Sequence, residues 1–326
     1  MRGARIAGTG SYAPPRVITN AELERMVDTS DEWITTRTGI KERHVADDGV
    51  ASSDLAAEAS KIAMAEARIT AEEIQLVIVA TVTPDRLFPS TACTLQEKLG
   101  ASNAAAMDLS AACSGFVYGL SVASGLIGIG ALDRVLVVGV ETLSKLVDWE
   151  DRNTCVLFGD GAGAAVVVPC ETGRGVLSTS MGSDGSLGTL LELPAGGSLH
   201  PATQETLNTR MHFIKMKGNE VFKSAVRSME TVAKDAMKKA GVGADEVALL
   251  IPHQANLRII EATAKRLGIG MDRVFVNVNK YGNTSAASVP LALDEARKEG
   301  RVKEGDLVCL VAFGAGFTWG SAVLRW

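Results

Sequence analysis

The pattern of apolar and polar positions is written twice along this chain of 326 residues. The segment AMAEARITAEEIQLVI from Ala63 and the segment AMKKAGVGADEVALLI from Ala236 match at one constant offset, and each copy continues through further helices and strands. Helices that alternate with strands predict parallel sheets with helices on their faces. We therefore predict an α/β fold of two pseudo-symmetric halves, residues 1–172 and 173–326, packed as a layered α/β sandwich.

A cysteine stands at the most informative junction of this pattern. The apolar run 104–109 predicts a strand and the uncharged residues 114–132 predict a helix, so Cys113 falls at the helix N-terminus. Backbone N–H groups and the helix dipole there favour the thiolate over the thiol. Position alone leaves two interpretations open, a covalent nucleophile for acyl transfer and a small buried cysteine of a core helix.

The duplication brings two further polar residues toward Cys113. The strand ending in ALLIP delivers His253 at its carboxyl end, where ligand sites of open α/β sheets gather. Asn283 follows a strand of the second half, and we match it with Cys113 as the start of an equivalent helix. The simpler alternatives are a hydrogen-bonded interface histidine and a helix N-cap shared with Thr284 and Ser285. Together with the symmetry, the three residues favour a catalytic set.

Composition and charge exclude several classes of function. A net charge of −5 and a pI of about 5.5 argue against general nucleic-acid binding. The five cysteines show no ligand spacing, so we expect no disulfide, no metal site and a cytoplasmic location, and no signal peptide is recognisable. The uncharged stretch 109–132 predicts a core helix rather than a membrane span, because it is rich in small residues. We expect the remaining histidines at the surface: His44, His200 and His212.

Three segments of the chain are rich in glycine. GTGSYA from Gly8 imitates a dinucleotide fingerprint, but Pro14 and Pro15 exclude the helix that the motif needs. Residues 158–168 lack the Lys-Ser/Thr pair of a P-loop and predict a tight turn before a buried strand. Residues 314–316 join two strands through small side chains, which allow a backbone N–H to approach a substrate oxygen.

Taken together, these segments resemble β-ketoacyl-acyl carrier protein synthase III, a condensing enzyme of the thiolase superfamily. Cys113 in DLSAACSGF, His253 in PHQANLRI and Asn283 in KYGNTSAAS carry the resemblance, with FGAGFTWGSAVLRW at the end of the chain. DEWITTRTGI and FGDGAGA extend it over essentially the whole sequence. The resemblance implies a thiolase-like fold and a decarboxylative Claisen condensation that initiates type II fatty acid synthesis.

In that reaction an acyl group, expected to be acetyl, moves from acyl-CoA to Cys113, and malonyl-acyl carrier protein then loses CO₂ and attacks the thioester. The resemblance implies that His253 and Asn283 hold the enolate oxygen. The backbone N–H groups of Cys113 and Ala315 would hold the tetrahedral oxyanion. The family usually has Gly where this chain has Ala315.

The resemblance also implies binding residues, a homodimer, and no cofactor beyond the CoA thioester substrate. Trp33, Arg37 and Arg152 match contacts to the CoA nucleotide. Phe88 matches a position that shapes the acyl pocket across the dimer interface, and its size favours a short starter. The segment that matches the carrier-binding residues consists of Gln254, Ala255, Asn256, Leu257 and Arg258. Nearby basic residues that suit an acidic carrier are Lys215, Lys217, Lys223, Arg227, Lys265 and Arg266.

Other functions stay open at this point. A related synthase of secondary metabolism would use other acyl-CoA starters. A cysteine peptidase can share the order Cys-His-Asn, but its usual flanking sequence is absent and the duplication has no place in that fold. A non-catalytic CoA-binding or carrier-binding protein would lack a member of the set, and none is missing.

Overall fold

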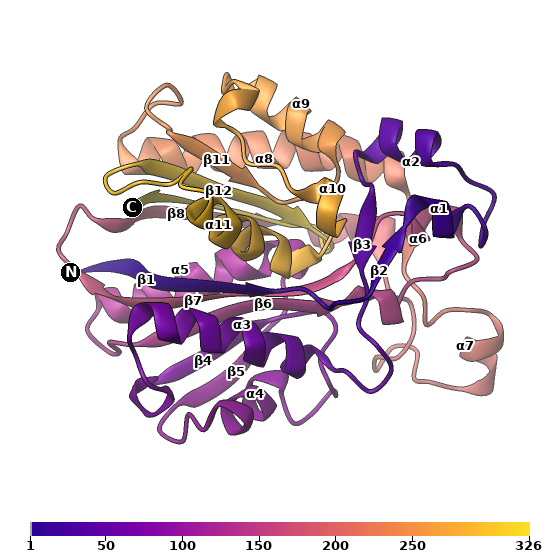
Figure 1. Ribbon diagram of the computed structural model, residues 1–326, viewed down its shortest axis with the longest axis horizontal. Helices are drawn as coiled ribbons and strands as arrows, with labels where there is room; N and C mark the ends of the chain where they lie inside the picture. The colour runs from indigo at the N-terminus through magenta and orange to yellow at the C-terminus, as the bar shows by residue number, and fades with distance from the viewer. Residues whose placement is uncertain (1) are drawn as a thin grey trace.

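Layers of helices alternate with one five-stranded and one four-stranded sheet (Figure 1). The computed structural model describes residues 2–326. The first sheet has the strand order β1-β7-β6-β4-β5, and the second has the order β11-β12-β13-β8. The strands of the first sheet are β1 (Gly3–Tyr12), β4 (Leu76–Ala80), β5 (Ala105–Leu109), β6 (Val135–Thr142) and β7 (Asp160–Cys170). Those of the second are β8 (Gly175–Ser183), β11 (Leu249–Pro252), β12 (Leu307–Gly314) and β13 (Thr318–Arg325).

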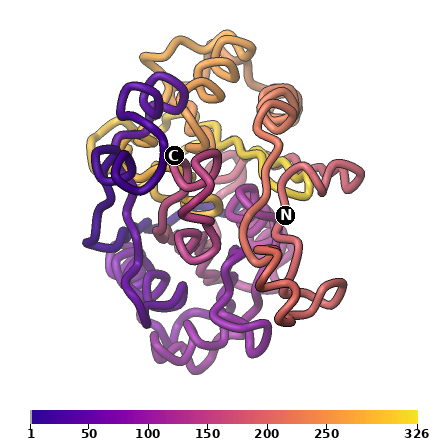
Figure 2. Tube along the Cα trace, turned by 90° about the vertical axis from the view of Figure 1, so that its right-hand side faces the viewer, coloured from indigo at the N-terminus to yellow at the C-terminus, as the bar shows by residue number. Residues whose placement is uncertain are grey.

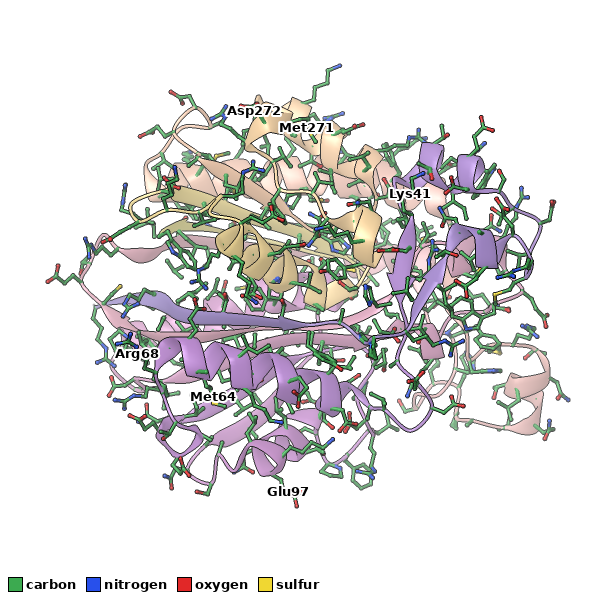
Figure 3. All side chains as sticks on the ribbon, in the orientation of Figure 1. Lys41, Met64, Arg68, Glu97, Met271 and Asp272 are labelled. Carbon is green, nitrogen blue, oxygen red and sulfur yellow. The ribbon has the colours of Figure 1, made fainter. Side chains whose placement is uncertain are left out.

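Two helices, α5 (Gly115–Gly128) and α11 (Ser288–Lys298), lie between the sheets and contact strands of both. The outer face of the first sheet is covered by α3 (Ser52–Ala67) and α4 (Thr91–Leu99), and that of the second by α8 (Gly218–Ala240) and α9 (Leu257–Leu267). Met64 on α3 is buried, whereas Arg68 and Glu97 project outward (Figure 3). The thiolase-like layered fold is therefore as predicted.

Shorter helices and strands flank these layers. They are β2 (Val17–Thr19), α1 (Asn20–Leu23), α2 (Asp31–Thr38), β3 (Glu42–His44), η1 (Ala71–Glu73), η3 (Leu143–Lys145), α6 (Arg152–Cys155), η4 (Gly185–Leu190), β9 (Leu191–Glu192), α7 (Gln204–Asn208), β10 (Lys215–Met216), η5 (Met271–Arg273) and α10 (Val278–Tyr281). Residues 191–216 leave the second half of the chain and run beside the first half, as the ribbon in Figure 1 and the tube in Figure 2 show.

The sheets are mixed, so the prediction of parallel sheets holds only for part of each. β4 pairs in parallel with β5 and β6, and β11 with β12, because helical crossovers connect these strands. β1, β7, β8 and β13 pair antiparallel. In the second half the expected counterpart of β5 is reduced to a single bridge between Leu250 and Val274.

Two turns at the centre of the structure are related by the sequence repeat, with one correction of register. The offset of 173 residues between Ala63 and Ala236 also relates Cys113 to Ala286, and the short turn η2 (Ala112–Ser114) to the turn η6 (Ser285–Ala287). Both turns begin with a residue at positive φ, 46° at Ala112 and 47° at Ser285. Asn283 precedes η6, so it is not the counterpart of Cys113, although it lies near the same turn.

The glycines of GTGSYA lie inside β1 rather than after it. A Cβ added at Gly8 or Gly10 would stand 2.4 Å from the Ala63 carbonyl oxygen or 2.3 Å from that of Ala59, respectively. These glycines therefore let α3 pack closely on the strand, which explains the motif without a nucleotide.

The structure also bears on the expectations for a membrane span, for the cysteines and for the remaining histidines. Within residues 2–326, no helix has the length and apolar character to cross a bilayer, and the stretch 109–132 forms the buried α5 with its flanks. All five cysteines are free thiols. His200 is exposed, but His44 is half-buried, with Nδ1 2.5 Å from the Pro14 carbonyl oxygen, and His212 has a buried Nδ1. The expected surface histidine is therefore clear at His200, whereas His44 and His212 are only partly exposed.

Candidate active site

Cys113 lies in η2, the turn that joins β5 to α5, and its residue is 8% exposed. The turn packs so closely on β12 that a Cβ at Gly314 would stand 2.5 Å from the Cys113 nitrogen. The Thr318 hydroxyl donates to the Ala111 carbonyl oxygen over 2.7 Å. The hairpin of the second half thereby holds the nucleophile's turn in place.

His253 and Asn283 reach the same place from the second half. His253 follows β11 directly, and its backbone N–H donates to the Val311 carbonyl oxygen over 2.7 Å. The Asn283 N–H donates to the Leu157 carbonyl oxygen over 2.8 Å. Its side-chain Oδ1 accepts from the Ser285 N–H over 2.9 Å, so the Nδ2 group is the end of the amide left for a ligand.

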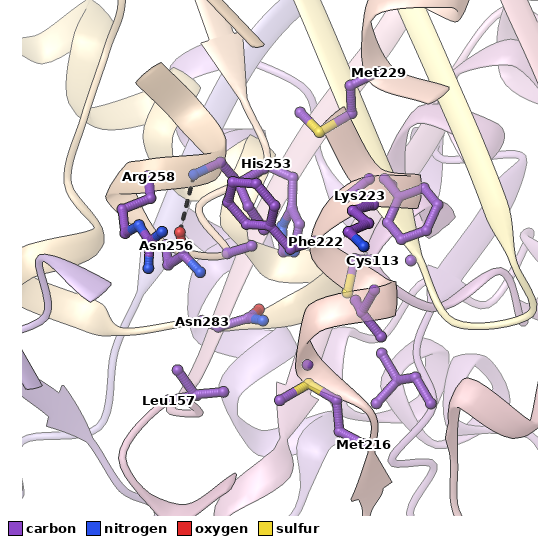
Figure 4. A pocket seen from close by; sticks show the side chains of 18 of the residues that line it. Cys113, Leu157, Met216, Phe222, Lys223, Met229, His253, Asn256, Arg258 and Asn283 are labelled. Carbon is purple, nitrogen blue, oxygen red and sulfur yellow. Dashed lines mark hydrogen bonds between the residues drawn. The ribbon is translucent and has the colours of Figure 1, made fainter. Parts of the chain in front are cut away.

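Cys113, His253 and Asn283 line one cavity of about 420 Å³ (Figure 4). Its wall also includes Phe222 of α8 and Asn256 at the start of α9. The structure thus brings the predicted set together from two halves of the chain.

A second cavity of about 220 Å³ also reaches Cys113. Its walls are mainly apolar and include Val82, Leu143, Leu146 and Ile214. Cys113 therefore lies where a cavity with polar groups meets an apolar one, and an acyl group on its sulfur would have an apolar space beside it.

Burial determines the protonation of the two titratable groups of the set. It raises the pKa of the Cys113 thiol to about 12 and lowers the pKa of His253 to about 3. Burial therefore opposes the thiolate that the helix N-terminus was expected to favour, because it removes water from the sulfur. A neutral thiol and a neutral imidazole are present at pH 7.

Ser288 selects the tautomer of His253. The Ser288 hydroxyl oxygen lies 2.6 Å from His253 Nδ1 and accepts the backbone N–H of Gln254 over 3.4 Å. Among residues 2–326, Nδ1 is the only acceptor that this hydroxyl contacts, so we assign the hydroxyl proton to the bond with Nδ1. The other nitrogen, Nε2, then carries a proton and is a hydrogen-bond donor.

Comparison with known proteins gives the family. Residues 107–185 match the family model 3-Oxoacyl-[acyl-carrier-protein (ACP)] synthase III, and residues 237–326 match the model of its C-terminal part. The Beta-ketoacyl-[acyl-carrier-protein] synthase III of Caldanaerobacter subterraneus subsp. tengcongensis is 56% identical over 323 residues, which are 99% of this chain and 98% of the relative. This chain belongs to the β-ketoacyl-acyl carrier protein synthase III family.

Further relatives agree. The synthase III of Natranaerobius thermophilus is 55% identical and covers 100% of both chains. The crystal structure of 3-oxoacyl-[acyl-carrier-protein] synthase III from Aquifex aeolicus VF5 superposes with a TM-score of 0.92 at 53% identity, over 99% of this chain and 100% of that chain. The priming β-ketosynthase of the R1128 polyketide pathway has a TM-score of 0.92 at 36% identity, over 99% and 96%.

The residues that the synthase III family suggests for the CoA nucleotide cluster on the surface. The guanidinium carbons of Arg37 and Arg152 lie 4.5 Å and 5.1 Å from the centre of the Trp33 ring. Arg152 also donates to the Asp28 carbonyl oxygen over 2.7 Å. The cluster joins α2 to α6 and lies outside the set of residues that line the two cavities.

The segment expected to bind the carrier protein divides into buried and exposed residues. Gln254 is 1% exposed, and its side-chain amide is used inside the protein, so its assignment as a carrier contact is wrong. Asn256 accepts the Ile259 N–H and caps α9, Ala255 lines the larger cavity, and Leu257 packs beneath Gly39.

Two exposed cations, Lys223 and Arg258, line the larger cavity. Arg258 is exposed and lies with its guanidinium carbon 5.6 Å from the Phe222 ring centre. Lys223 lines the cavity beside it. Arg266 is instead paired with Glu230 at 2.8 Å. The remaining basic residues of the group are exposed: Lys215, Lys217, Arg227 and Lys265.

Phe88 does not line either cavity of its own chain. It is 84% exposed, and its neighbour Leu87 is 81% exposed. The two side chains form an exposed apolar pair on the surface of the single chain.

Glu141 was not expected at the site, and Ser285 was expected only as part of a helix N-cap. Glu141 near the end of β6 is fully buried, and Ser285 donates to it over 3.0 Å. The only signal in the sequence is one carboxylate in the apolar run VLVVGVET.

Proposed function

We propose that this protein catalyses the initiating condensation of type II fatty acid synthesis, from acyl-CoA and malonyl-acyl carrier protein to 3-oxoacyl-acyl carrier protein, CoA and CO₂. The observation that carries the proposal is the shared cavity of Cys113, His253 and Asn283 in a chain that matches synthase III enzymes over its full length. Acetyl-CoA is the proposed starter, and no cofactor is required.

In the first half-reaction the Cys113 sulfur attacks the thioester carbon, the bond to the CoA sulfur breaks, and the CoA thiolate leaves. The negative charge on the carbonyl oxygen is stabilised by the backbone N–H groups of Cys113 and Ala315. Gly314 without a side chain supports this assignment, because it lets the turn of Cys113 pack against the β12–β13 hairpin that carries Ala315. The acyl group then occupies the apolar cavity that Ala315 also lines.

In the second half-reaction the malonyl group loses CO₂, and the electron pair of the broken bond forms an enolate. The Nε2–H of His253 and the Nδ2–H of Asn283 donate to the enolate oxygen. Both are donors held by the surrounding protein, through Ser288 and through the Ser285 N–H respectively, so little reorganisation accompanies the step. The enolate carbon attacks the acyl carbon, and the Cys113 thiolate leaves.

The remaining surfaces fit the two substrates. The indole of Trp33 with Arg37 and Arg152 offers an aromatic face and two cations for the CoA nucleotide. Arg258 and Lys223 offer positive charge to an acidic carrier protein near the larger cavity.

A homodimer in the cytoplasm is part of the proposal. β5 is the last strand of its sheet, so its outer edge has backbone groups to share with a second copy. Phe88 and Leu87 are exposed in the single chain, which fits a role of Phe88 in the partner's acyl cavity. The five free thiols suit a reducing compartment.

Intact-mass measurement after incubation with a panel of acyl-CoAs tests the proposal. We expect one acetyl group on the wild type and on Cys93→Ser, a control at an exposed cysteine, and none on Cys113→Ala. Addition of malonyl-acyl carrier protein is expected to release CO₂ and discharge the enzyme. A preference for long or branched starters would favour the alternative synthase of secondary metabolism, and absence of any adduct on the wild type would refute both.

A further inference from the structure

A buried carboxylate next to the nucleophile has no part in the chemistry above. Glu141 is fully buried, and its oxygens accept the Val82 N–H over 3.1 Å, the Thr83 hydroxyl over 2.7 Å and the Ser285 hydroxyl over 3.0 Å. Thr81 adds a longer bond of 3.3 Å. Within residues 2–326 it forms no ion pair with Lys, Arg or His, although burial of an unpaired carboxylate is costly.

Ser285 connects this carboxylate to Cys113. Its hydroxyl donates to Glu141, and Cys113 and Ser285 line the apolar cavity together. Hydrogen bonding from the Ser285 side chain also opposes the rise in the pKa of the Cys113 thiol. Ser285 adopts φ 47°, an uncommon value for a residue with a side chain. η6 lies close on β6 here, since a Cβ at Gly139 would stand 2.2 Å from the Ala286 carbonyl oxygen. The fold thus maintains a strained turn that holds the Ser285 hydroxyl on the carboxylate, in the cavity that Cys113 also lines.

The reaction needs such a group, because the thiol must lose its proton when its sulfur attacks. His253 is poorly suited to take it: Ser288 donates to Nδ1, so Nε2 already carries a proton. Burial also lowers the pKa of His253 to about 3, whereas it raises the pKa of Glu141 to about 7. Near neutral pH the carboxylate of Glu141 is the stronger base of the two.

We propose that Glu141, acting through the Ser285 hydroxyl, accepts the Cys113 thiol proton as the sulfur attacks the acyl-CoA thioester and returns it when the Cys113 thiolate leaves in the condensation. The S–H proton passes to Ser285 Oγ while the Ser285 proton passes to the carboxylate, and both moves reverse at the end of the cycle. The departing CoA thiolate takes its proton from solvent. Glu141 is thus a positioning residue that rests on the proposed function and touches no substrate.

The test measures the rate of Cys113 acetylation by acetyl-CoA in single turnovers from pH 6 to 9. The variants are Glu141→Gln, Ser285→Ala and their double variant, with Glu97→Gln on the outer surface of α4 as the matched control (Figure 3). Cys113 is the titratable group that faces Glu141, and its other neighbours, Thr81, Val82, Thr83 and Ser285, are uncharged. Thermal unfolding of each variant checks that it is folded, and Ser285→Ala keeps the test decisive if Glu141→Gln does not fold.

We expect acetylation of Glu141→Gln and Ser285→Ala to be about 10²-fold slower at pH 7, a typical contribution of a general base. Their rates should rise about tenfold per pH unit, because only the free thiolate reacts, so the deficit shrinks toward pH 9. The wild type should level off above about pH 7, where Glu141 is ionised. The double variant should be no slower than either single variant, since both interrupt one path.

Three results would overturn the relay. They are a loss by the same factor at every pH, which indicates a structural role; acetylation as fast as in Glu97→Gln; and faster acetylation, which indicates that the charge of Glu141 only suppresses the thiolate. Each of these results differs from a failure of the proposed function. In that case the wild type itself takes no acetyl group, and the relay is refuted as well.

Discussion

Substitution of Gly314 by alanine should displace the nucleophile without changing any group that reacts. A Cβ at this position would stand 2.5 Å from the Cys113 nitrogen and 3.1 Å from the Cβ atoms of Ala112 and Cys113. Ordinary contacts begin at 3.4 Å, so the η2 turn and β12 must move apart by nearly 1 Å. Both segments belong to close-packed layers, and the movement has no flexible side chain to absorb it.

The size of the effect follows from this displacement. A misplacement of about 1 Å costs roughly 10²-fold in rate when reacting groups must be aligned. Overpacking of a core by one methyl group destabilises a protein by about 1–3 kcal/mol. We therefore expect Gly314→Ala to acetylate Cys113 about 10²-fold more slowly and to unfold at a lower temperature.

The assay is the single-turnover acetylation of Cys113, followed by intact mass, with thermal unfolding in parallel. Gly125→Ala is the matched control, because Gly125 is exposed in α5 and a Cβ there meets nothing within 4 Å. It should acetylate at the wild-type rate and be more stable by up to about 1 kcal/mol, the difference in helix propensity. Normal acetylation and unchanged stability in Gly314→Ala would refute the reasoning.

Three further predictions concern single side chains. Ser288→Ala should slow malonyl decarboxylation about 10²-fold, the cost of losing one oriented donor, while Cys113 acetylation changes little; equal losses in both steps would contradict the assigned tautomer of His253. Trp33→Ala should raise KM for acetyl-CoA about tenfold or more with kcat unchanged, since stacking on one base contributes about 1–3 kcal/mol; an unchanged KM would remove Trp33 from the CoA site. Because the pKa of Glu141 is raised from 4.5 to about 7 on folding, its stabilising contribution is complete below pH 4.5 and is lost as pH rises through 7. Urea unfolding should therefore show the wild type losing about 3 kcal/mol relative to Glu141→Gln between pH 4.5 and 8, at 1.36 kcal/mol per pKa unit; an equal difference at both pH values would contradict it.

The parts of the fold that repeat in sequence were predictable. The matched segments from Ala63 and Ala236 predict the alternation of helix and strand. In the structure the first segment belongs to α3 and β4, and the second to α8 and β11. Except for the two strands joined by the short segment 314–316, the antiparallel strands were not predictable in the same way, because their apolar runs carry no record of direction. Packing between distant segments determines whether a strand is connected to its neighbour by a helix or by a hairpin.

In the candidate site, position along the chain predicted placement better than electrostatics. Cys113 does precede α5, but its protonation depends on burial by β12 and η6, which lie far away in the sequence. Gln254 stands in a segment that resembles a binding surface, yet its amide is used by the backbone of Asn277 and Val278. Glu141 was overlooked because its partner Ser285 is 144 positions away.

The two turns at the centre of the molecule have different neighbours in the two copies. Position 141 of the first copy corresponds to position 314 of the second at the same offset of 173 residues. One holds a carboxylate against η6, and the other holds no side chain at all against η2. Joining the copies in one polypeptide uncouples their evolution, because a mutation in one repeat is no longer imposed on its twin. A symmetric pair of identical subunits lacks that freedom and cannot carry a carboxylate at one of these positions and a glycine at the other.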